Sequence, residues 1–231
     1  MNKLLKITLL SLVIVWSTGA TIVVNGPAVF PAPAGASWLV TEDFETSGPT
    51  TGWTVSGDTP NLTWNSTSSP ITGSSSAKTA GRGNSVSAQY DFTATSDLWV
   101  YFAHQTLNSV PFMYSVIISD PSSGDALSIG YWGSSNFRFT GGNQDNFPSY
   151  TISTATTLYF WLHDTKGTGS NAVGELYVST TTTKPGSPLS SWTNSNMTHD
   201  LSRITLNYSS NGADYKWDYL RVSSSIIGSA P

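Results

Sequence analysis

Short runs of alternating apolar and polar residues recur along the chain from Trp38 onward, separated by clusters of Gly, Pro, Asn, Asp and Ser. Alternation with a period of two turns one face of a strand toward a core, and frequent turn signals are typical of a sandwich or barrel. The pattern predicts strands at 38–44, 52–56, 76–80, 86–93, 98–106, 112–119, 126–132, 135–140, 157–164, 173–179, 201–207 and 215–223. Residues 180–200, which contain Pro185 and Pro188, are predicted to form a long surface loop.

Two turn segments predict which strands pair. Residues 120–125 read Asp-Pro-Ser-Ser-Gly-Asp, and residues 166–171 read Lys-Gly-Thr-Gly-Ser-Asn. Both are rich in the residues that tight turns require. Each therefore predicts an antiparallel hairpin of the two strands that flank it.

The strands at 98–104 and 158–164 carry large apolar side chains on both faces. Their aliphatic positions predict the core face. The opposite face then carries four aromatic residues, Trp99, Tyr101, Tyr159 and Trp161. In a curved sandwich, that face is expected to be concave and partly open.

The N-terminal twenty residues have the parts of a secretory signal peptide. Lys3 and Lys6 precede an apolar run over residues 7–16, and small residues end at Ala20, after which we predict cleavage. The alternative is an uncleaved anchor, although the run is shorter than the ~20 residues that span a bilayer. The protein is therefore predicted to be secreted, or displayed on a virion or cell surface.

The rest of the chain divides by composition. Residues 21–37 are rich in Pro and Ala and predict a spacer or an extended edge strand. Residues 38–225 have a length that suits one β-sandwich, and residues 226–231 are predicted to be a tail.

Charge and cysteine content exclude several classes of function. Charged residues make up 10% of the chain, the net charge is −4, and no run of Lys or Arg occurs. The basic surface that nucleic-acid binding requires is thus missing. The sequence contains no Cys, which excludes disulfides, thiolate metal sites and a cysteine nucleophile.

Four short motifs carry a resemblance to a known family. They are Glu42-Asp43-Phe44-Glu45, Gly52-Trp53-Thr54-Val55-Ser56-Gly57, Ser74-Ser75-Ser76-Ala77-Lys78, and Lys216-Trp217-Asp218-Tyr219-Leu220-Arg221-Val222. Together they resemble the opening and closing strands of concanavalin A-like (laminin-G-like) domains and carbohydrate-binding jelly rolls. The resemblance implies an all-β fold, a two-sheet antiparallel β-sandwich, and for many members glycan binding. Similar domains also occur in viral appendage proteins.

The acidic residues of the first motif suggest two kinds of site. Glycosidases of similar fold carry an E-x-D-x-E pattern on one strand, and its absence here disfavours hydrolysis. By resemblance, Glu42, Glu45 and Asp218 match the positions that hold a structural Ca²⁺ in several jelly rolls. The alternative is a set of solvated edge acids facing Lys216 or Arg221. Calcium is the one cofactor that the resemblance suggests.

Histidines offer a second candidate centre. His104 and His163 end two similar strands, so their approach, with Asp164, would form a metal or acid–base site. The alternative is that both are half-exposed strand caps. No G-x-S-x-G elbow is present.

Aromatic residues give the strongest indication of function. Sugars stack their flat C–H faces on rings while amides and carboxylates bond the hydroxyls. The candidate ligand-binding residues are Trp99, Tyr101, Tyr131, Trp132, Tyr159, Trp161, Asn143 and Asp145. Each ring has the alternative role of a core side chain, which is the one we predict for Trp53 and Trp217.

These observations predict a secreted, non-catalytic module that binds a carbohydrate or a cell-surface polymer, with no nucleic-acid partner and no membrane association after signal cleavage. The main alternative is a structural or adhesive decoration domain, such as one on a virion. A glycoside hydrolase is disfavoured, and the protein is predicted not to be an enzyme.

Overall fold

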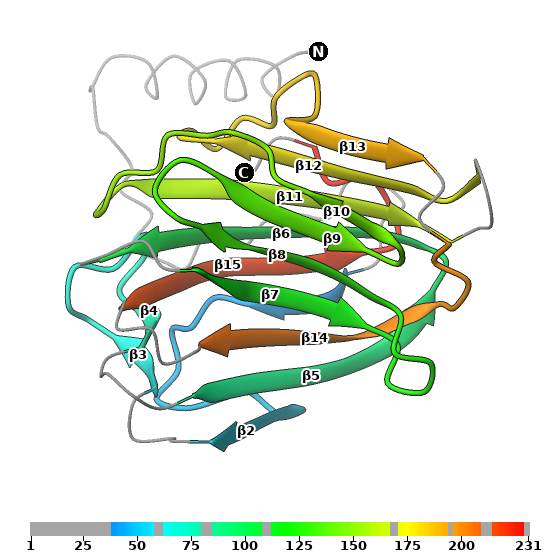
Figure 1. Cartoon of the computed structure of the whole chain (residues 1–231). Coiled ribbons are helices and arrows are strands. Elements are labelled where there is room, and N and C mark those ends of the chain that lie inside the picture. Colours follow the sequence, from blue (N-terminus) through cyan, green and yellow to red (C-terminus); the bar gives the residue numbers. More distant parts are fainter. Residues whose placement is uncertain are drawn as a thin grey trace, which may run out of the picture.

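The computed structural model describes residues 38–57, 62–79, 85–107, 112–166, 171–193, 196–208 and 214–228. The predicted signal peptide and the predicted spacer lie outside the described residues. Within the described part, the chain forms two antiparallel β-sheets and no α-helix (Figure 1). None of it is a helix long and apolar enough to cross a membrane.

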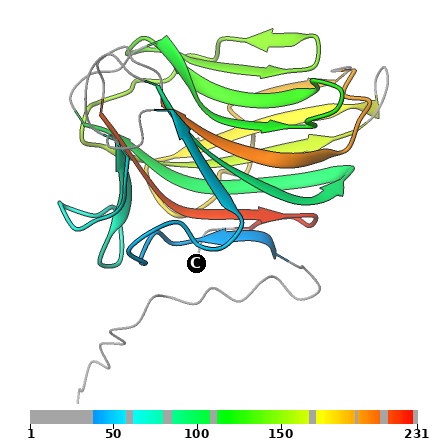
Figure 2. The ribbon, with the colours of Figure 1, turned by 90° about the horizontal axis from the view of Figure 1, so that it is seen from below.

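Sheet A has eight strands, seven of them in the order β13-β12-β11-β6-β15-β4-β3, with β1 also paired to β15. Their bounds are β1 (Trp38–Glu42), β3 (Leu62–Ser66), β4 (Ser76–Thr79), β6 (Asp97–Thr106), β11 (Thr157–Thr165), β12 (Val173–Ser179), β13 (Ser190–Thr193) and β15 (Tyr215–Ser223). The first and last strands thus lie side by side, as Figure 2 shows for β1 in blue and β15 in red.

Sheet B has seven strands in the order β10-β9-β8-β7-β14-β5-β2. Their bounds are β2 (Trp53–Gly57), β5 (Val86–Thr95), β7 (Phe112–Ser119), β8 (Ala126–Trp132), β9 (Phe137–Gly141), β10 (Gln144–Asn146) and β14 (Leu201–Tyr208). The two sheets stack into the predicted sandwich, which confirms the fold class.

Both predicted hairpins are confirmed. Ser119 pairs with Ala126 across the first turn, and Thr165 pairs with Val173 across the second. In the first turn, Gly124 adopts a φ of 81°, a conformation that favours glycine. The strands that sequence patterning misses are β3, β10 and β13, which are short and carry mostly polar side chains.

The core lies between the sheets and is built as the alternation predicts. Val100, Phe102, Phe160 and Leu162 point inward and are buried, and the rings of the two phenylalanines stack at 4.8 Å. Burying one such ring contributes about 2 to 3 kcal/mol. Because neighbouring positions on β6 and β11 must face away from this core, their aromatic residues lie on the outer face of sheet A.

Candidate functional site

The predicted calcium ligands accept hydrogen bonds from loop donors in this structure. Glu42 accepts bonds from the Phe44 N–H at 2.9 Å and the Thr50 hydroxyl at 2.6 Å, and Glu45 accepts from the Ser74 N–H at 2.9 Å. Their oxygens are therefore satisfied by loop donors. No three His, Cys, Asp or Glu side chains among the described residues are grouped so that they could hold a metal ion.

Asp218, the third predicted calcium ligand, fastens a different loop. Its Oδ2 accepts from the Thr72 N–H at 3.0 Å and the Ser76 hydroxyl at 2.9 Å. Burial raises the pKa of the Asp218 carboxyl to about 7, and these hydrogen bonds oppose the rise. The three acids hold the loops next to β1 and β15. The ion pair of Arg221 with Asp43 likewise fastens the segment after β1 to β15.

Most of the aromatic rings predicted to bind a ligand are covered. Trp161 and Tyr101 are fully buried and Trp99 is nearly so, while Tyr159 is half-buried. They form a cluster with Tyr177 on the outer face of sheet A, as the alternation predicts. The expectation of an open face is wrong for these rings.

The covering segment comes from the C-terminal residues that were predicted to be a tail. Ile227 is buried in the cluster, and the indole N–H of Trp161 donates to the carbonyl oxygen of Gly228 at 3.0 Å. After β15, the chain therefore lies back over the outer face of the sheet that it has just completed. We call residues 224–228 the C-terminal strap.

His104 and His163 do not meet. His104 lies opposite Leu158 and His163 lies opposite Trp99, at opposite ends of the β6–β11 pair. His104 faces the core, where its Nδ1 lies 2.7 Å from the hydroxyl of Tyr131. Tyr131, which was also predicted to bind a ligand, is buried there. Burial lowers the pKa of His104 to about 3, so this imidazole is neutral.

His163 instead belongs to a network on the outer face of sheet A. Its Nδ1 lies 2.9 Å from Oε2 of Glu175, and its Nε2 lies 3.1 Å from Oδ1 of Asp97. The hydroxyl of Tyr177 donates to the same Glu175 oxygen at 3.0 Å. We call these four residues the His163 network. It reaches solvent, since the side chains of Asp97, Glu175 and His163 are 55%, 24% and 15% exposed.

The surroundings adjust the chemistry of the network. The Trp99 indole stacks on the His163 ring with centroids 4.1 Å apart, and the Lys184 ammonium lies 3.6 Å from the centre of the Tyr177 ring. Burial, with the hydrogen bond to Glu175, raises the pKa of Tyr177 to about 12. Burial also lowers the pKa of Lys184, and the negative charge of Glu175 opposes that shift.

The sequence does not identify the partners of His163. Counting outward from the predicted turn at 166–171 would place Gly174 across from His163, whereas the structure pairs Thr165 with Val173 and so places Glu175 there. The sequence also does not predict that Asp97 contacts His163. This contact depends on the register between β6 and β11, which are far apart in the chain.

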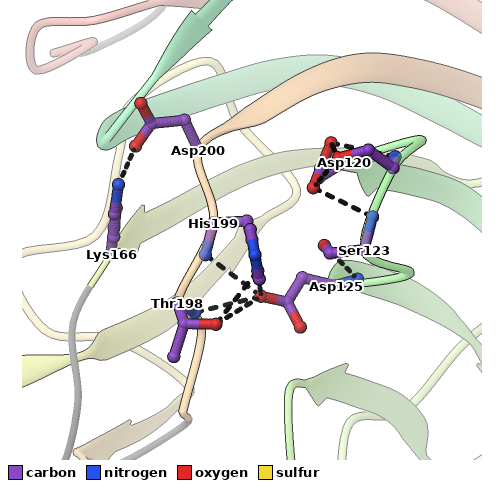
Figure 3. A network of polar contacts seen from close by, with 8 residues as sticks. Asp120, Ser123, Asp125, Lys166, Thr198, His199 and Asp200 are labelled. Carbon is purple, nitrogen blue, oxygen red and sulfur yellow. Dashed lines mark hydrogen bonds and ion pairs between the residues drawn. The ribbon is translucent and has the colours of Figure 1, made fainter.

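His199, the third histidine, lies just before β14 and contacts the turn between β7 and β8 (Figure 3). Oδ2 of Asp125 lies 3.0 Å from Nδ1 of His199, and the Thr198 hydroxyl approaches that same nitrogen at 3.0 Å. A catalytic triad needs the acid and the nucleophile on different ring nitrogens. These residues therefore fasten the β7–β8 turn to the segment that leads into β14.

Two of the predicted ligand-binding residues do lie together on the surface. Trp132, at the end of β8, is 42% exposed, and Asp145 on β10 is also exposed. Arg138 on β9 lies between them, paired to Asp145 and over the Trp132 ring. Asn143 is exposed at the β9–β10 turn, where its side-chain oxygen accepts from Gln144.

Comparison with known proteins identifies the fold. No protein-family model and no curated protein matches the chain. Among solved structures, the cellulose-induced protein Cip1 has a TM-score of 0.56 at 16% identity, covering 82% of this chain and 99% of its own. The alginate lyase from Aplysia kurodai has a TM-score of 0.57 at 9% identity, with 81% and 99% covered. A sialidase has a TM-score of 0.61 at 13% identity, covering 82% of this chain and 19% of the sialidase.

These similarities correct one prediction. The expectation that the protein is not an enzyme is wrong as an inference from the fold, because the sandwich is shared with an alginate lyase and a sialidase. At such low identity the comparisons establish the fold alone.

Proposed function

We propose that this protein is a carbohydrate-active enzyme that cleaves a glycosidic bond at the His163 network. The observation that carries the proposal is the linked set of two carboxylates, one imidazole and one phenol on the outer face of sheet A. The carboxylates and the imidazole reach solvent, and the Tyr177 ring is buried beside them. Acid–base chemistry at a glycosidic bond requires such groups within hydrogen-bond reach of the atoms that gain or lose a proton.

Tyr177 is suited to deliver a proton. Cleavage by hydrolysis or by elimination requires protonation of the leaving oxygen. A phenol whose pKa is raised to about 12 keeps its proton at neutral pH. Tyr177 donates that proton to Glu175, so transfer to the leaving oxygen requires the substrate oxygen to replace Glu175 as its acceptor. Glu175 accepts hydrogen bonds from both Tyr177 and His163, so it is the central acceptor of the network.

His163 positions the two carboxylates. Both ring nitrogens of His163 lie within hydrogen-bond distance of a carboxylate oxygen. The ring therefore lies between Asp97 and Glu175 and holds them on opposite sides of itself. Stacking against Trp99 fixes the plane of the ring.

The location supports a carbohydrate as the substrate. Lys184, which lies over the Trp99 and Tyr177 rings, borders the network, and its ammonium with the two carboxylates can hydrogen-bond the hydroxyls of a sugar. The fold shared with an alginate lyase and a sialidase supports the same substrate class. The leader predicted over residues 1–20 supports action outside the cell, where polysaccharides are abundant.

The test is product release by the full chain from a panel of neutral and uronate-containing polysaccharides. New reducing ends indicate cleavage, and ultraviolet absorbance of an unsaturated sugar distinguishes elimination from hydrolysis. Tyr177→Phe is expected to lower kcat by roughly 10² to 10⁴-fold, the typical contribution of a general acid, with little change in KM.

Tyr90→Phe is the matched control, because Tyr90 lies on β5 in the opposite sheet and is expected to leave kcat unchanged. Failure to cleave any polysaccharide, or full activity in Tyr177→Phe, would contradict the proposal.

A further inference from the structure

Two large aromatic side chains lie exposed beside each other at one end of sheet B. Trp132 and Phe147 are 42% and 44% exposed, and they are the only exposed aromatic residues among the large apolar side chains that the structure describes. Their ring centroids lie 5.1 Å apart at an interplanar angle of 64°. Single exposed apolar residues are common on proteins, but adjacent exposed rings indicate a contact surface.

A charged pair holds the two rings in place. The Arg138 guanidinium lies 5.4 Å from the centre of the Trp132 ring and 5.7 Å from that of Phe147. Its Nε and Nη2 atoms donate to the two oxygens of Asp145 at 3.0 and 2.9 Å. A bidentate pair has a defined geometry, so the guanidinium is held over both rings.

The backbone that carries Phe147 is fastened as well. The Asn136 side chain donates to the carbonyl oxygen of Phe147 at 3.3 Å and to the Ser149 hydroxyl at 3.2 Å. The Phe137 N–H donates to the carbonyl oxygen of Pro148 at 3.0 Å. The surface is therefore pre-organised, which lowers the entropic cost of binding a ligand.

The chemistry of this surface selects the class of ligand. Exposed rings suit the C–H faces of a sugar. The Arg138 guanidinium is a hydrogen-bond donor and the Asp145 carboxylate an acceptor for the hydroxyls of that sugar. The pair has no net charge, so the surface provides no excess positive charge to attract a polyanion. These features favour an uncharged sugar chain over a uronate polymer.

We propose that Trp132, Phe147, Arg138 and Asp145 form a docking site for a neutral polysaccharide, which we call the Trp132 platform. It lies on β8, β9, β10 and the residue after β10 in sheet B, whereas the His163 network lies on the outer face of sheet A. The platform is thus a second site that does not depend on catalysis at the first.

Affinity electrophoresis of the full chain in gels that contain hydroxyethylcellulose or galactomannan tests the proposal, with alginate as the charged probe. The unsubstituted protein is expected to be retarded by a neutral polymer. Trp132→Ala is expected to weaken that retardation about tenfold or more, the loss of one stacked ring, and Trp132→Phe is expected to retain most of it.

Ile226→Ala is the matched control, because Ile226 is an exposed apolar residue outside the platform. Near-ultraviolet circular dichroism verifies that each variant is folded. Equal retardation of Trp132→Ala and the unsubstituted protein, or retardation by alginate alone, would overturn the proposal. Tyr177→Phe is expected to bind as the unsubstituted protein does, so a failure of the proposed cleavage leaves this test intact.

Discussion

At the scale of single residues, Asp164 is the most unusual ionisable group. Its side chain points inward at the end of β11 and is almost fully buried, and its Oδ1 has no hydrogen-bond partner in the described part of the chain. Burial raises the pKa of this carboxyl to about 7, with smaller contributions from the negative charges of Asp125 and Asp97. Folding therefore favours the protonated acid.

This shift predicts a pH-dependent stability. Between the ordinary value of 3.8 and the folded value of about 7, the folded state holds a proton that the unfolded state has lost. The free energy of unfolding therefore falls as pH rises through that window, by about 1.4 kcal/mol per unit at most. Asp164→Asn is expected to remove the loss and to be more stable than the unsubstituted protein by about 2 to 4 kcal/mol above pH 7.

Urea unfolding at pH 5 and pH 8 measures the effect. Asp91→Asn is the control. Arg203 lowers the pKa of that exposed carboxyl, so Asp91 is ionised in both the folded and unfolded states at pH 5 and pH 8, and this substitution is expected to change stability equally at both. A difference between Asp164→Asn and the unsubstituted protein that is the same at both pH values would show that Asp164 does not titrate in this window.

At the scale of elements, one tryptophan closes the open edge of the sandwich. Trp192 on β13 stacks on Phe139 of β9 with ring centroids 4.0 Å apart, so it joins sheet A to sheet B. Its indole fits between Gly141 and Gly174, because a Cβ atom on either glycine would overlap the ring. The hydrogen bond from Asn146 to Ser190, at 3.1 Å, links the same two edges.

Glycine at position 174 is therefore required by space. Gly174→Ala is expected to force the indole to move and to lower the free energy of unfolding by about 1 to 3 kcal/mol. Gly186→Ala is the matched control, since nothing lies within 4 Å of a Cβ atom at that position. Chemical denaturation compares the two variants, and equal stability would mean that Trp192 adapts without cost.

At the scale of the whole molecule, the sequence predicts the layers well and their contacts poorly. Alternation places Phe102 and Phe160 in the core and Trp161 on the opposite face, because strand geometry alone determines which side a residue faces. Whether that opposite face is open depends on another segment. The C-terminal strap, which has no strand pattern, covers it and buries Trp161.

The candidate site divides in the same way. Trp132 and Asp145 are near each other in sequence, and their strands β8 and β10 both pair with β9, so local patterning brings them together. The contact of His163 with Asp97 depends on a long-range register, and the predicted calcium ligands Glu42 and Asp218 bond to loops whose course no pattern specifies. Local periodicity predicts faces, while long-range register and loop paths determine sites.

The pairing of the first strand with the last has a mechanical consequence. Trp38 lies opposite Ser223, and Glu42 lies opposite Leu220, so tension applied at residues 38 and 224 would open the β1–β15 ladder one hydrogen bond at a time. Tension at residues 46 and 224 would load those bonds together, in shear. Because the chain has no native cysteine, handles attached through Trp38→Cys or Thr46→Cys, each with Ser224→Cys, allow single-molecule pulling in both directions. The pair at residues 38 and 224 is expected to yield at the lower force. A tether attached there would therefore separate β1 from β15 easily under load. Equal forces for the two pairs of handles would contradict this account.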